Sequence, residues 1–380
     1  MSKKSTIFIS LLLALIFITS SFSAASAISK DELTAKFNST AEHLISLPTP
    51  QVGSIGGDWV VLGLARADLL SESEKNAYYE NVEKYIKSVG SERLHQRKST
   101  DNSRVIIALS AIGEDPTNVC GYDLTAPLSD INYVKKQGIN GVFWALTALD
   151  CCNFGSVETR DKLISEILSA QHSDGGWGLD ENISDPDMTA MALTALSQYR
   201  FFDADVRSAT ERGVALLASM QRESGGYYSY DDFNPESCAQ VIVALASLGI
   251  NFENDPRFCK SGVSLVDSLM RFSVDGGFEH TIGNGYNQMA TEQAFYALTA
   301  YYRFVEDKTA LYDMTDIQNF AFYDIDGDGI ESINDATYLQ RYLAEFDDQL
   351  SVSQKRLSDL NRNGRVDVGD VTCYQRMLAS

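Results

Sequence analysis

The chain has 380 residues, with 52 acidic against 31 basic side chains and a formal net charge of -21 at pH 7. Binding to nucleic acid and to anionic membranes depends on Lys and Arg meeting phosphates, so this balance argues against both as partners. Six scattered cysteines are too few for a disulfide framework, and four isolated histidines show no zinc-binding spacing.

The first segment, residues 1–27, has the pattern of a secretory signal peptide. Two lysines precede an apolar stretch from Ile7 to Thr19, and Ala25-Ser26-Ala27 supplies small residues for cleavage. We expect the mature chain to begin at Ile28. Since no later run reaches the roughly 18 apolar residues of a membrane span, we predict a protein secreted to the extracellular side.

Three glycine-aromatic motifs recur at intervals of 50 and 51 residues: Gly175-Gly176-Trp177, Gly225-Gly226-Tyr227 and Gly276-Gly277-Phe278. Each motif lies between an amphipathic helical stretch and one that is apolar nearly all round. Such an apolar helix is buried on all sides, so the repeat predicts hairpins of one outer and one inner helix.

The same pattern extends upstream and predicts six hairpins in all. The expected inner helices cover 59–69, 102–112, 141–151, 189–196, 238–246 and 293–300. The expected outer helices cover 30–46, 72–89, 128–136, 160–171, 204–221 and 258–272. Closing the hairpins into a ring gives every inner helix two inner neighbours. We therefore predict an all-α fold, an α6/α6 toroid over residues 28–312.

The segments Gln171 to Trp177 and Gln221 to Tyr227 resemble the repeat of the prenyltransferase and squalene-cyclase superfamily. The resemblance implies a terpenoid cyclase-like toroid. The stretch Val52 to Trp59 further resembles a branch of that superfamily found in bacterial surface proteins, whose activity is mostly unassigned.

The superfamily's two chemistries map poorly onto this sequence. Asp187, in Asp185-Pro186-Asp187-Met188, aligns with the proton donor of class II terpene cyclases, but Met188 replaces the last acid of their motif. The alternative role is an acid that favours a helix N-terminus. Asp150-Cys151-Cys152 has the Asp-x-Cys spacing of the prenyltransferase zinc ligands. It falls at the tail of its inner helix, whereas the family's pair lies at the cavity end, so we reject a zinc enzyme.

A glycoside hydrolase is a further alternative, because (α/α)6 toroids also serve that class. It would need two carboxylates across a cleft lined with aromatics. The candidate acids near inner-helix starts are Asp101, Asp187, Glu236 and Glu292, and the candidate sugar-stacking residues are Trp59, Trp144, Tyr228 and Tyr286. Helix capping and core packing explain the same residues.

After about Asp313 the chain changes to two aspartate-rich segments 35 residues apart. Oxygen-bearing side chains fall at positions 1, 3, 5, 9 and 12, with glycine at position 6 and a backbone carbonyl available at position 7, which is calcium-loop chemistry. The predicted ligands are Asp324, Asp326, Asp328, Ile330, Ser332 and Asp335 in loop 1, and Asp359, Asn361, Asn363, Arg365, Asp367 and Asp370 in loop 2. We therefore expect two calcium ions.

With Asp rather than Glu at position 12, and a matching helix after each loop, residues 313–380 resemble a type I-like dockerin. The resemblance implies a cohesin module on a scaffold protein as partner, with two pseudo-symmetric ways to dock. It assigns the contacts to Ile333, Asn334, Gln340 and Arg341 from one half and to Val368, Gly369, Gln375 and Arg376 from the other.

Together these features predict a secreted cellulosome-type component. Its dockerin would attach it to a scaffold, and its toroid would be a non-catalytic domain that binds an unidentified ligand at its mouth. Two alternatives remain open: a glycoside hydrolase of polysaccharide catabolism, and a terpene cyclase-like enzyme with Asp187 as the acid.

Overall fold

The structure is a computed structural model that describes residues 27–180, 182–229, 232–317, 322–346 and 349–379. Residues 1–26 of the predicted signal peptide lie outside the described residues. Nearly all of the regular secondary structure in the described part is helical, as predicted. A search of these residues finds no helix with the length and hydropathy of a membrane span.

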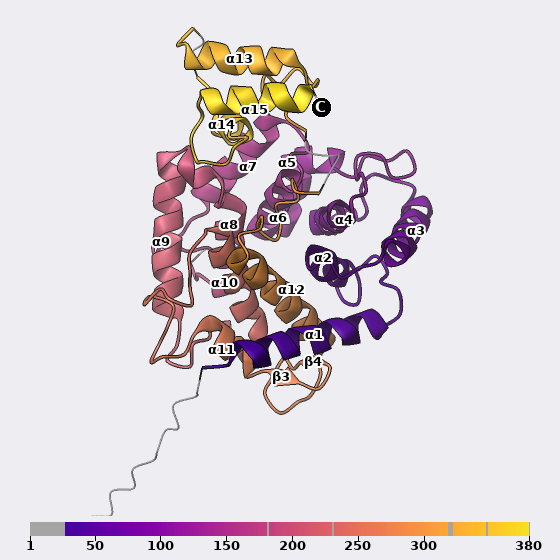
Figure 1. Cartoon of the computed structure of the whole chain (residues 1–380), viewed down its shortest axis with the longest axis vertical. Coiled ribbons are helices and arrows are strands. Elements are labelled where there is room, and N and C mark those ends of the chain that lie inside the picture. Colours follow the sequence, from indigo (N-terminus) through magenta and orange to yellow (C-terminus); the bar gives the residue numbers. More distant parts are fainter. Residues whose placement is uncertain (1–26, 181, 230–231, 318–321, 347–348, 380) are drawn as a thin grey trace, which may run out of the picture.

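Six inner helices line the axis of the described chain, and each packs against the next until α12 returns to α2 (Figure 1). They are α2 (Asp58–Arg66), α4 (Ser99–Ile112), α6 (Ile139–Asp150), α8 (Pro186–Leu196), α10 (Pro235–Ser247) and α12 (Gln288–Val305). Most of their residues are buried, because an inner helix contacts neighbours on several faces. The ring confirms the predicted toroid.

Four outer helices form where the sequence predicts them. They are α1 (Lys30–Ser46), α3 (Glu72–Val89), α7 (Val157–Ser169) and α9 (Ala204–Met220). Ser29 and Ser71 begin α1 and α3 with capping boxes, in which the serine side chain and a glutamate three residues later satisfy each other's backbone N–H.

The other two predicted outer helices are wrong in extent. Residues 128–136 are divided among the 3-10 helix η1 (Ala126–Ser129), α5 (Ile131–Val134) and the 3-10 helix η2 (Lys135–Gln137). Asp130 separates η1 from α5 because its backbone is extended, with φ -82° and ψ 93°, and its side chain caps α5.

The predicted helix 258–272 forms only at its end, as α11 (Leu265–Met270). Ser261 and Gly262 have φ values of 51° and 80°, which place them in the left-handed region, and Lys260 pairs with Val263 across this turn. A helix cannot run through two left-handed residues, so α11 begins only after Ser264, which caps it.

The glycine-aromatic motifs join the outer helix of a hairpin to its inner helix and pack on that outer helix. Gly175 and Gly225 have φ values of 95° and 81°, which glycine adopts without strain. The aromatic side chains that follow are fully buried: the Trp177 indole donates to the Ile167 carbonyl at 2.8 Å, and the Tyr227 hydroxyl donates to the Leu217 carbonyl at 3.0 Å.

One short antiparallel hairpin follows the second motif, and another contains the third motif. Strands β1 (Tyr228–Ser229) and β2 (Asp232–Phe233) pair with Tyr228 opposite Phe233, while β3 (Ser273–Val274) pairs with β4 (Gly277–Phe278). These turns lie just before the inner helices α10 and α12 and so belong to the N-terminal rim of the ring.

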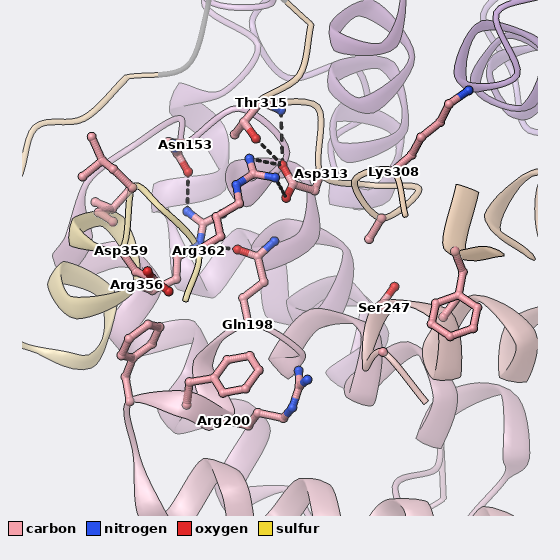
Figure 2. Close-up of a pocket in the computed structure, with 18 of the residues that line it drawn as sticks. Asn153, Gln198, Arg200, Ser247, Lys308, Asp313, Thr315, Arg356, Asp359 and Arg362 are labelled. Carbon is pink, nitrogen blue, oxygen red and sulfur yellow. Dashed lines mark hydrogen bonds and ion pairs between the residues drawn. The ribbon is translucent and has the colours of Figure 1, made fainter. Parts of the chain in front are cut away.

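The C-terminal segment adds α13 (Ile333–Leu343), α14 (Val352–Ser358) and α15 (Val368–Leu378), which lie together at one end of the toroid (Figure 1). Helix α14 packs on α7 and on the 3-10 helix η3 (Tyr199–Phe201), while α13 and α15 pack on each other. Arg356 of α14 reaches Asn153 and Gln198 of the toroid (Figure 2).

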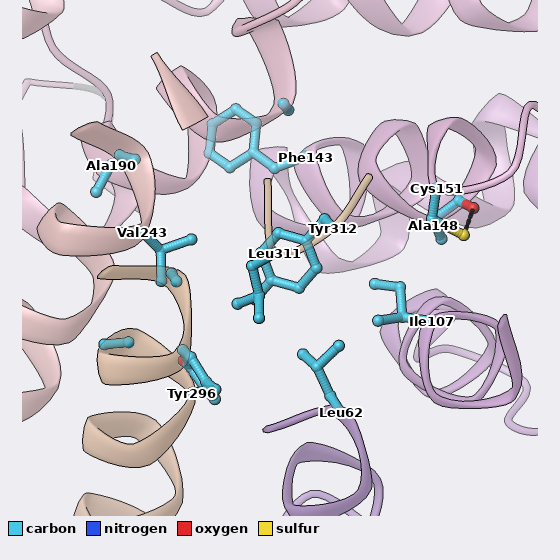
Figure 3. Close-up of a cluster of buried hydrophobic side chains, with 14 of the residues drawn as sticks. Leu62, Ile107, Phe143, Ala148, Cys151, Ala190, Val243, Tyr296, Leu311 and Tyr312 are labelled. Atoms are coloured by element: carbon cyan, nitrogen blue, oxygen red, sulfur yellow. Dashed lines mark hydrogen bonds between the residues drawn. The ribbon is translucent and has the colours of Figure 1, made fainter. Parts of the chain in front are cut away.

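The segment that connects α12 to the C-terminal helices, which we call the linker, passes through the centre of the ring. Leu311 and Tyr312 lie among side chains from all six inner helices (Figure 3), and both are buried. The Arg66 guanidinium donates to the backbone carbonyls of Leu311 and Asp313, at 3.1 and 2.8 Å. Arg303 donates to the Thr309 carbonyl and, with Arg66, forms an ion pair with Asp316. The linker therefore closes this end of the axis.

Tyr312 gives a direct test of this closure. Replacing it with alanine leaves a cavity at the axis and should lower the free energy of unfolding by about 3 kcal/mol. Tyr312→Phe should change it by less than about 1 kcal/mol, because the buried hydroxyl has no hydrogen-bond partner among the described residues. Denaturant unfolding followed by tryptophan fluorescence measures both. An alanine variant as stable as the wild type would contradict the filled axis.

Candidate functional site

Loop 1 gathers three carboxylates at the C-terminal end of the linker. Ligand oxygens of Asp324, Asp326 and Asp328 all lie within 4.8 Å of one another. Burial, followed by the neighbouring carboxylates Asp335, Asp328 and Asp324, raises the pKa of Asp326. A cluster of acids that resist ionising together is relieved by a cation, and an all-oxygen donor set suits calcium.

The carboxylate of Asp335, at position 12, connects loop 1 to the helices around it. It is fully buried; Oδ1 accepts from the backbone N–H of Ile325 at 2.7 Å, and Oδ2 accepts from that of Ser332 at 2.8 Å. The Tyr374 hydroxyl of α15 donates to the same carboxylate at 3.0 Å and thereby links the two halves. Sequence spacing identified Asp335 but gave no signal for Tyr374.

Loop 2 repeats this arrangement. Asp359 accepts from the backbone N–H groups of Asn363 and Gly364, at 3.0 and 2.9 Å. Asp370 is fully buried and accepts from the N–H groups of Asn361 and Asp367, at 3.1 and 2.8 Å. The predicted donors of both loops therefore occupy matching places and fit the oxygen set that calcium requires.

Helices α13 and α15 present their predicted contact residues on the outside of the molecule. Ile333 is 57% exposed and Val368 is 74% exposed, each at the first position of its helix. Asn334, Gln340 and Gln375 are also exposed, as are Arg341 and Arg376, whereas Gly369 is half-buried. Exposed apolar residues at equivalent positions of two repeated helices are typical of a docking surface.

The opposite end of the toroid carries the predicted acids. Asp101, Asp187 and Glu236 lie in the first turns of their inner helices, and Glu292 lies in the second turn of α12. Asp101 pairs with Arg104 at 3.2 Å. Glu236 binds His280 Nδ1 at 2.9 Å, while Nε2 of the same imidazole contacts Asp232 at 2.9 Å.

Asp187 and Glu292 differ from these paired acids. Asp187 Oδ1 and Glu292 Oε2 are buried and have no hydrogen-bond partner among the described residues. Burial, then the charge of Asp185, raises the pKa of Asp187 to about 7. Burial, with a smaller contribution from Asp58, raises the pKa of Glu292 to about 7. Both groups are therefore able to hold a proton near neutral pH.

The four predicted sugar-stacking aromatics fall into two groups. Trp59 and Trp144 pack on each other near the axis, with ring centroids 5.0 Å apart, and Trp144 meets Tyr312 edge-on at 5.7 Å. Tyr228 and Tyr286 instead lie in the loops before α10 and α12 and are exposed. We call the exposed large apolar and aromatic residues in the segments before α2, α8, α10 and α12 the rim: Ile55, Leu179, Ile183, Tyr228, Ile282 and Tyr286.

The two superfamily motifs have structural duties here. Asp185 caps α8 by accepting from the N–H groups of Asp187 and Met188, at 2.9 and 3.1 Å. Asp150 lies at the other end of the ring, where it accepts from Arg160 and from the Tyr199 hydroxyl. The thiols of Cys151 and Cys152 are both buried, and they donate to the carbonyls of Ala148 and Met314, respectively.

The ring of inner helices and the paired calcium-type loops define a helical toroid protein with a docking module. The chain belongs to the family of the prenyltransferase alpha-alpha toroid domain, whose family model matches residues 124–320. Residues 322–379 match the dockerin type I domain. Dockerins of this type bind calcium and pair with cohesins, which agrees with the loops and helices described above.

Solved structures with a similar fold include unsaturated glucuronyl hydrolase from Streptococcus agalactiae, with a TM-score of 0.50, 12% identity, and coverage of 75% of this chain and 94% of that chain. Unsaturated glucuronyl hydrolase from Bacillus sp. GL1 has a TM-score of 0.49 and 11% identity, with coverage of 75% of this chain and 99% of that chain. The type II terpene cyclase MstE from Scytonema has a TM-score of 0.49 and 13% identity, with coverage of 71% of this chain and 96% of that chain. No curated protein matches the chain.

Metal removal tests the two loops. Chelation should leave the clustered carboxylates repelling one another, so α13 and α15, of 11 residues each, should lose order. Circular dichroism at 222 nm should fall on adding EDTA and recover with excess calcium. An unchanged helical signal after exhaustive chelation would show that the loops hold their shape without a cation.

The pKa of Asp187 gives a second test. Its folded pKa of about 7 lies above the ordinary value of 3.8, so the folded chain keeps a proton that the unfolded chain releases between these pH values. Stability should fall as pH rises through this window. Asp187→Asn should remove that part of the fall and stabilise the chain by about 1 to 4 kcal/mol at pH 8.

The matched control is Asp205→Asn. Asp205 is likewise the second residue of its helix, after a capping aspartate, but it is exposed. Its replacement should leave the pH dependence of urea unfolding unchanged. Equal slopes for wild type and Asp187→Asn would mean that the Asp187 carboxyl is ionised in the folded chain.

Proposed function

We propose that the protein is a secreted cellulosome-type component that docks through its calcium-dependent dockerin onto a scaffold cohesin. The observation that carries this proposal is the matched exposure of Ile333 and Val368 on α13 and α15, two helices that lie across the end of the toroid, beyond α14 (Figure 1). A cohesin can cover either apolar residue together with the polar side chains one and two turns further along the same helix.

The proposal includes two pseudo-symmetric docking modes. Ile333 and Val368 follow the ninth ligand position of loops 1 and 2, and α13 and α15 have the same length and the same capping arrangement. Rotating the partner by half a turn would therefore meet equivalent residues: Ile333, Asn334, Gln340 and Arg341 in one mode, and Val368, Gly369, Gln375 and Arg376 in the other.

The same proposal includes two further points: each loop holds one calcium ion, and residues 1–27 are removed on export. The backbone nitrogen of Ile28 donates to the Asp267 carboxylate at 2.7 Å. Cleavage before Ile28 would place a charged amino group at that carboxylate, which supports this processing site.

For the toroid we propose a binding role rather than catalysis. The space beside Tyr312, lined by Phe143, Trp144 and Gln240 among others, measures about 10 Å³. Ligand pockets usually need roughly 300 to 1,000 Å³, so the linker takes the place that a small molecule would occupy. We therefore assign ligand binding to the rim, at the end opposite the dockerin.

An enzymatic role is the second candidate, and the unpartnered atoms of Asp187 and Glu292 are the observation that favours it. Protonated acids near neutral pH suit general acid catalysis, as in a glycoside hydrolase or a terpene cyclase-like enzyme. Release of reducing sugar from plant polysaccharides, or conversion of a polyprene, that is abolished by Asp187→Asn would establish this role in place of simple binding.

Docking is tested by placing charge in the contact surface. Because each mode uses only one half, Ile333→Asp or Val368→Asp alone should weaken cohesin binding by less than about 10-fold, whereas the double variant should lose at least about 100-fold. Isothermal titration calorimetry against a type I cohesin in excess calcium measures these affinities.

Tyr228→Asp, on the rim, is the control and should bind the cohesin like the wild type. A double variant that retains full affinity would place the contact surface elsewhere on the chain. If one single variant abolished binding, calcium-dependent docking would still stand as the function, but a second docking mode would be contradicted.

A further inference from the structure

The dockerin has a second face, opposite the docking surface, that is joined to the toroid by a buried side chain. Only 5% of the Arg356 side chain is exposed. Its Nε donates to Gln198 Oε1 at 2.8 Å, its Nη2 donates to the Asp150 carbonyl at 3.1 Å, and its Nη1 donates to Asn153 (Figure 2). The guanidinium thus binds groups at and beyond the C-terminal ends of α6 and α8.

Calcium loop 2 continues directly from this anchor. Helix α14 ends at Ser358, and Asp359 is the first ligand position of the loop. Arg362 of the loop forms an ion pair with Asp313 of the linker at 3.1 Å (Figure 2). A side-chain carbon added at Gly364 would lie 3.2 Å from the Phe201 ring, so the loop backbone is packed against the toroid.

These contacts lead into the core of the toroid. Asp313 is bound by two arginines. Its carboxylate forms an ion pair with Arg362 of loop 2, and its backbone carbonyl accepts a hydrogen bond from the buried Arg66. The preceding residue, Tyr312, contacts the Trp144 ring at 5.7 Å. Loop 2 is therefore two contacts away from the axial core.

Loop 1 has the same internal arrangement but differs in its contacts with the toroid. Its carboxylates accept from N–H groups of the loop itself, as in Asp324 with Gly327 and Gly329, at 2.8 and 2.9 Å. Asp335 bonds to the loop and to Tyr374, and Gln354 donates to the Ile325 carbonyl. Except at its entrance, where Phe322 N–H donates to the Cys152 carbonyl at 3.3 Å, these bonds stay within the dockerin.

We propose that α14 and calcium loop 2 form a seam through which ion binding by loop 2, rather than by loop 1, stabilises the toroid itself. A free Arg362–Asp313 pair would contribute little, since 45% of the Arg362 side chain is exposed. The buried Arg356 fixes the loop in place, and ordering of Asp359 and its neighbours then holds Arg362 on Asp313. The inference rests on the proposed calcium binding of loop 2.

The tryptophans make the test specific to the toroid, since all three, Trp59, Trp144 and Trp177, lie there. Thermal unfolding followed by tryptophan fluorescence should shift upward by at least about 3 °C when excess calcium is added to the metal-free chain. Circular dichroism at 222 nm and calorimetric titration with calcium report binding by the dockerin independently.

Matched ligand variants separate the two loops. Asp328 and Asn363 both occupy position 5, and each accepts from the N–H two residues later, at 2.8 and 2.9 Å. Asp328→Ala should keep most of the calcium-dependent shift in the tryptophan transition, whereas Asn363→Ala should abolish it. Arg362→Ala, at an exposed position, should reduce the shift while leaving calcium affinity within about threefold of the wild type.

The outcomes distinguish the seam from calcium binding. A chain that shows no calcium binding in calorimetry would refute the proposed loading itself. A chain whose dockerin binds calcium and gains helicity, but whose tryptophan transition stays in place, would overturn the seam alone. Equal loss of the shift in Asp328→Ala and Asn363→Ala would also overturn it, because loop 1 would then transmit as much as loop 2.

Discussion

Repulsion among carboxylates is the constraint on which the C-terminal dockerin depends. Each pair of charges held about 4 Å apart repels by about 1 to 4 kcal/mol at surface-like dielectrics, and loop 1 holds three carboxylates closer than 4.8 Å. A divalent cation converts this repulsion into attraction. Each following helix carries the last ligand of its loop in its first turn, so the orientation of the helix depends on the same balance.

The polarity of the inner helices gives the toroid two different ends. Their C-terminal ends carry partial negative charge and unsatisfied carbonyls, and arginines gather there: Arg160 donates to the Leu149 carbonyl, and Arg356 of the dockerin donates to that of Asp150. Their N-terminal ends carry capping acids and the rim. The dockerin and the rim are therefore separated by the length of an inner helix, about 20 Å for the 13 residues of α10.

Local patterns in the sequence predicted much of this architecture. The repeated glycines and the apolar inner helices predicted the ring, because backbone geometry and burial leave a periodic trace. The calcium-type loops could be predicted for a similar reason, since the expected ligands of each loop are spaced along one short segment. The prediction of an outer helix over residues 258–272 was wrong, because the periodicity of apolar residues gives no sign that Ser261 has a left-handed backbone.

Contacts between distant segments left no such trace. Leu311 and Tyr312 read as an ordinary linker, and nothing nearby in the sequence shows that Arg66 will hold their backbone 245 residues away. Arg356 likewise looks like a surface arginine of a short helix. The seam between dockerin and toroid depends on these long-range pairs, and so does the filled axis of the ring.

The central claim is that ion-ordered loops present α13 and α15 to a cohesin. Its most direct measurement is the affinity of the intact chain for a type I cohesin, determined by surface plasmon resonance over a range of free calcium concentrations. Our account predicts that affinity rises with occupancy of the loops and disappears when calcium is removed. Tight binding that persists at vanishing free calcium would contradict it.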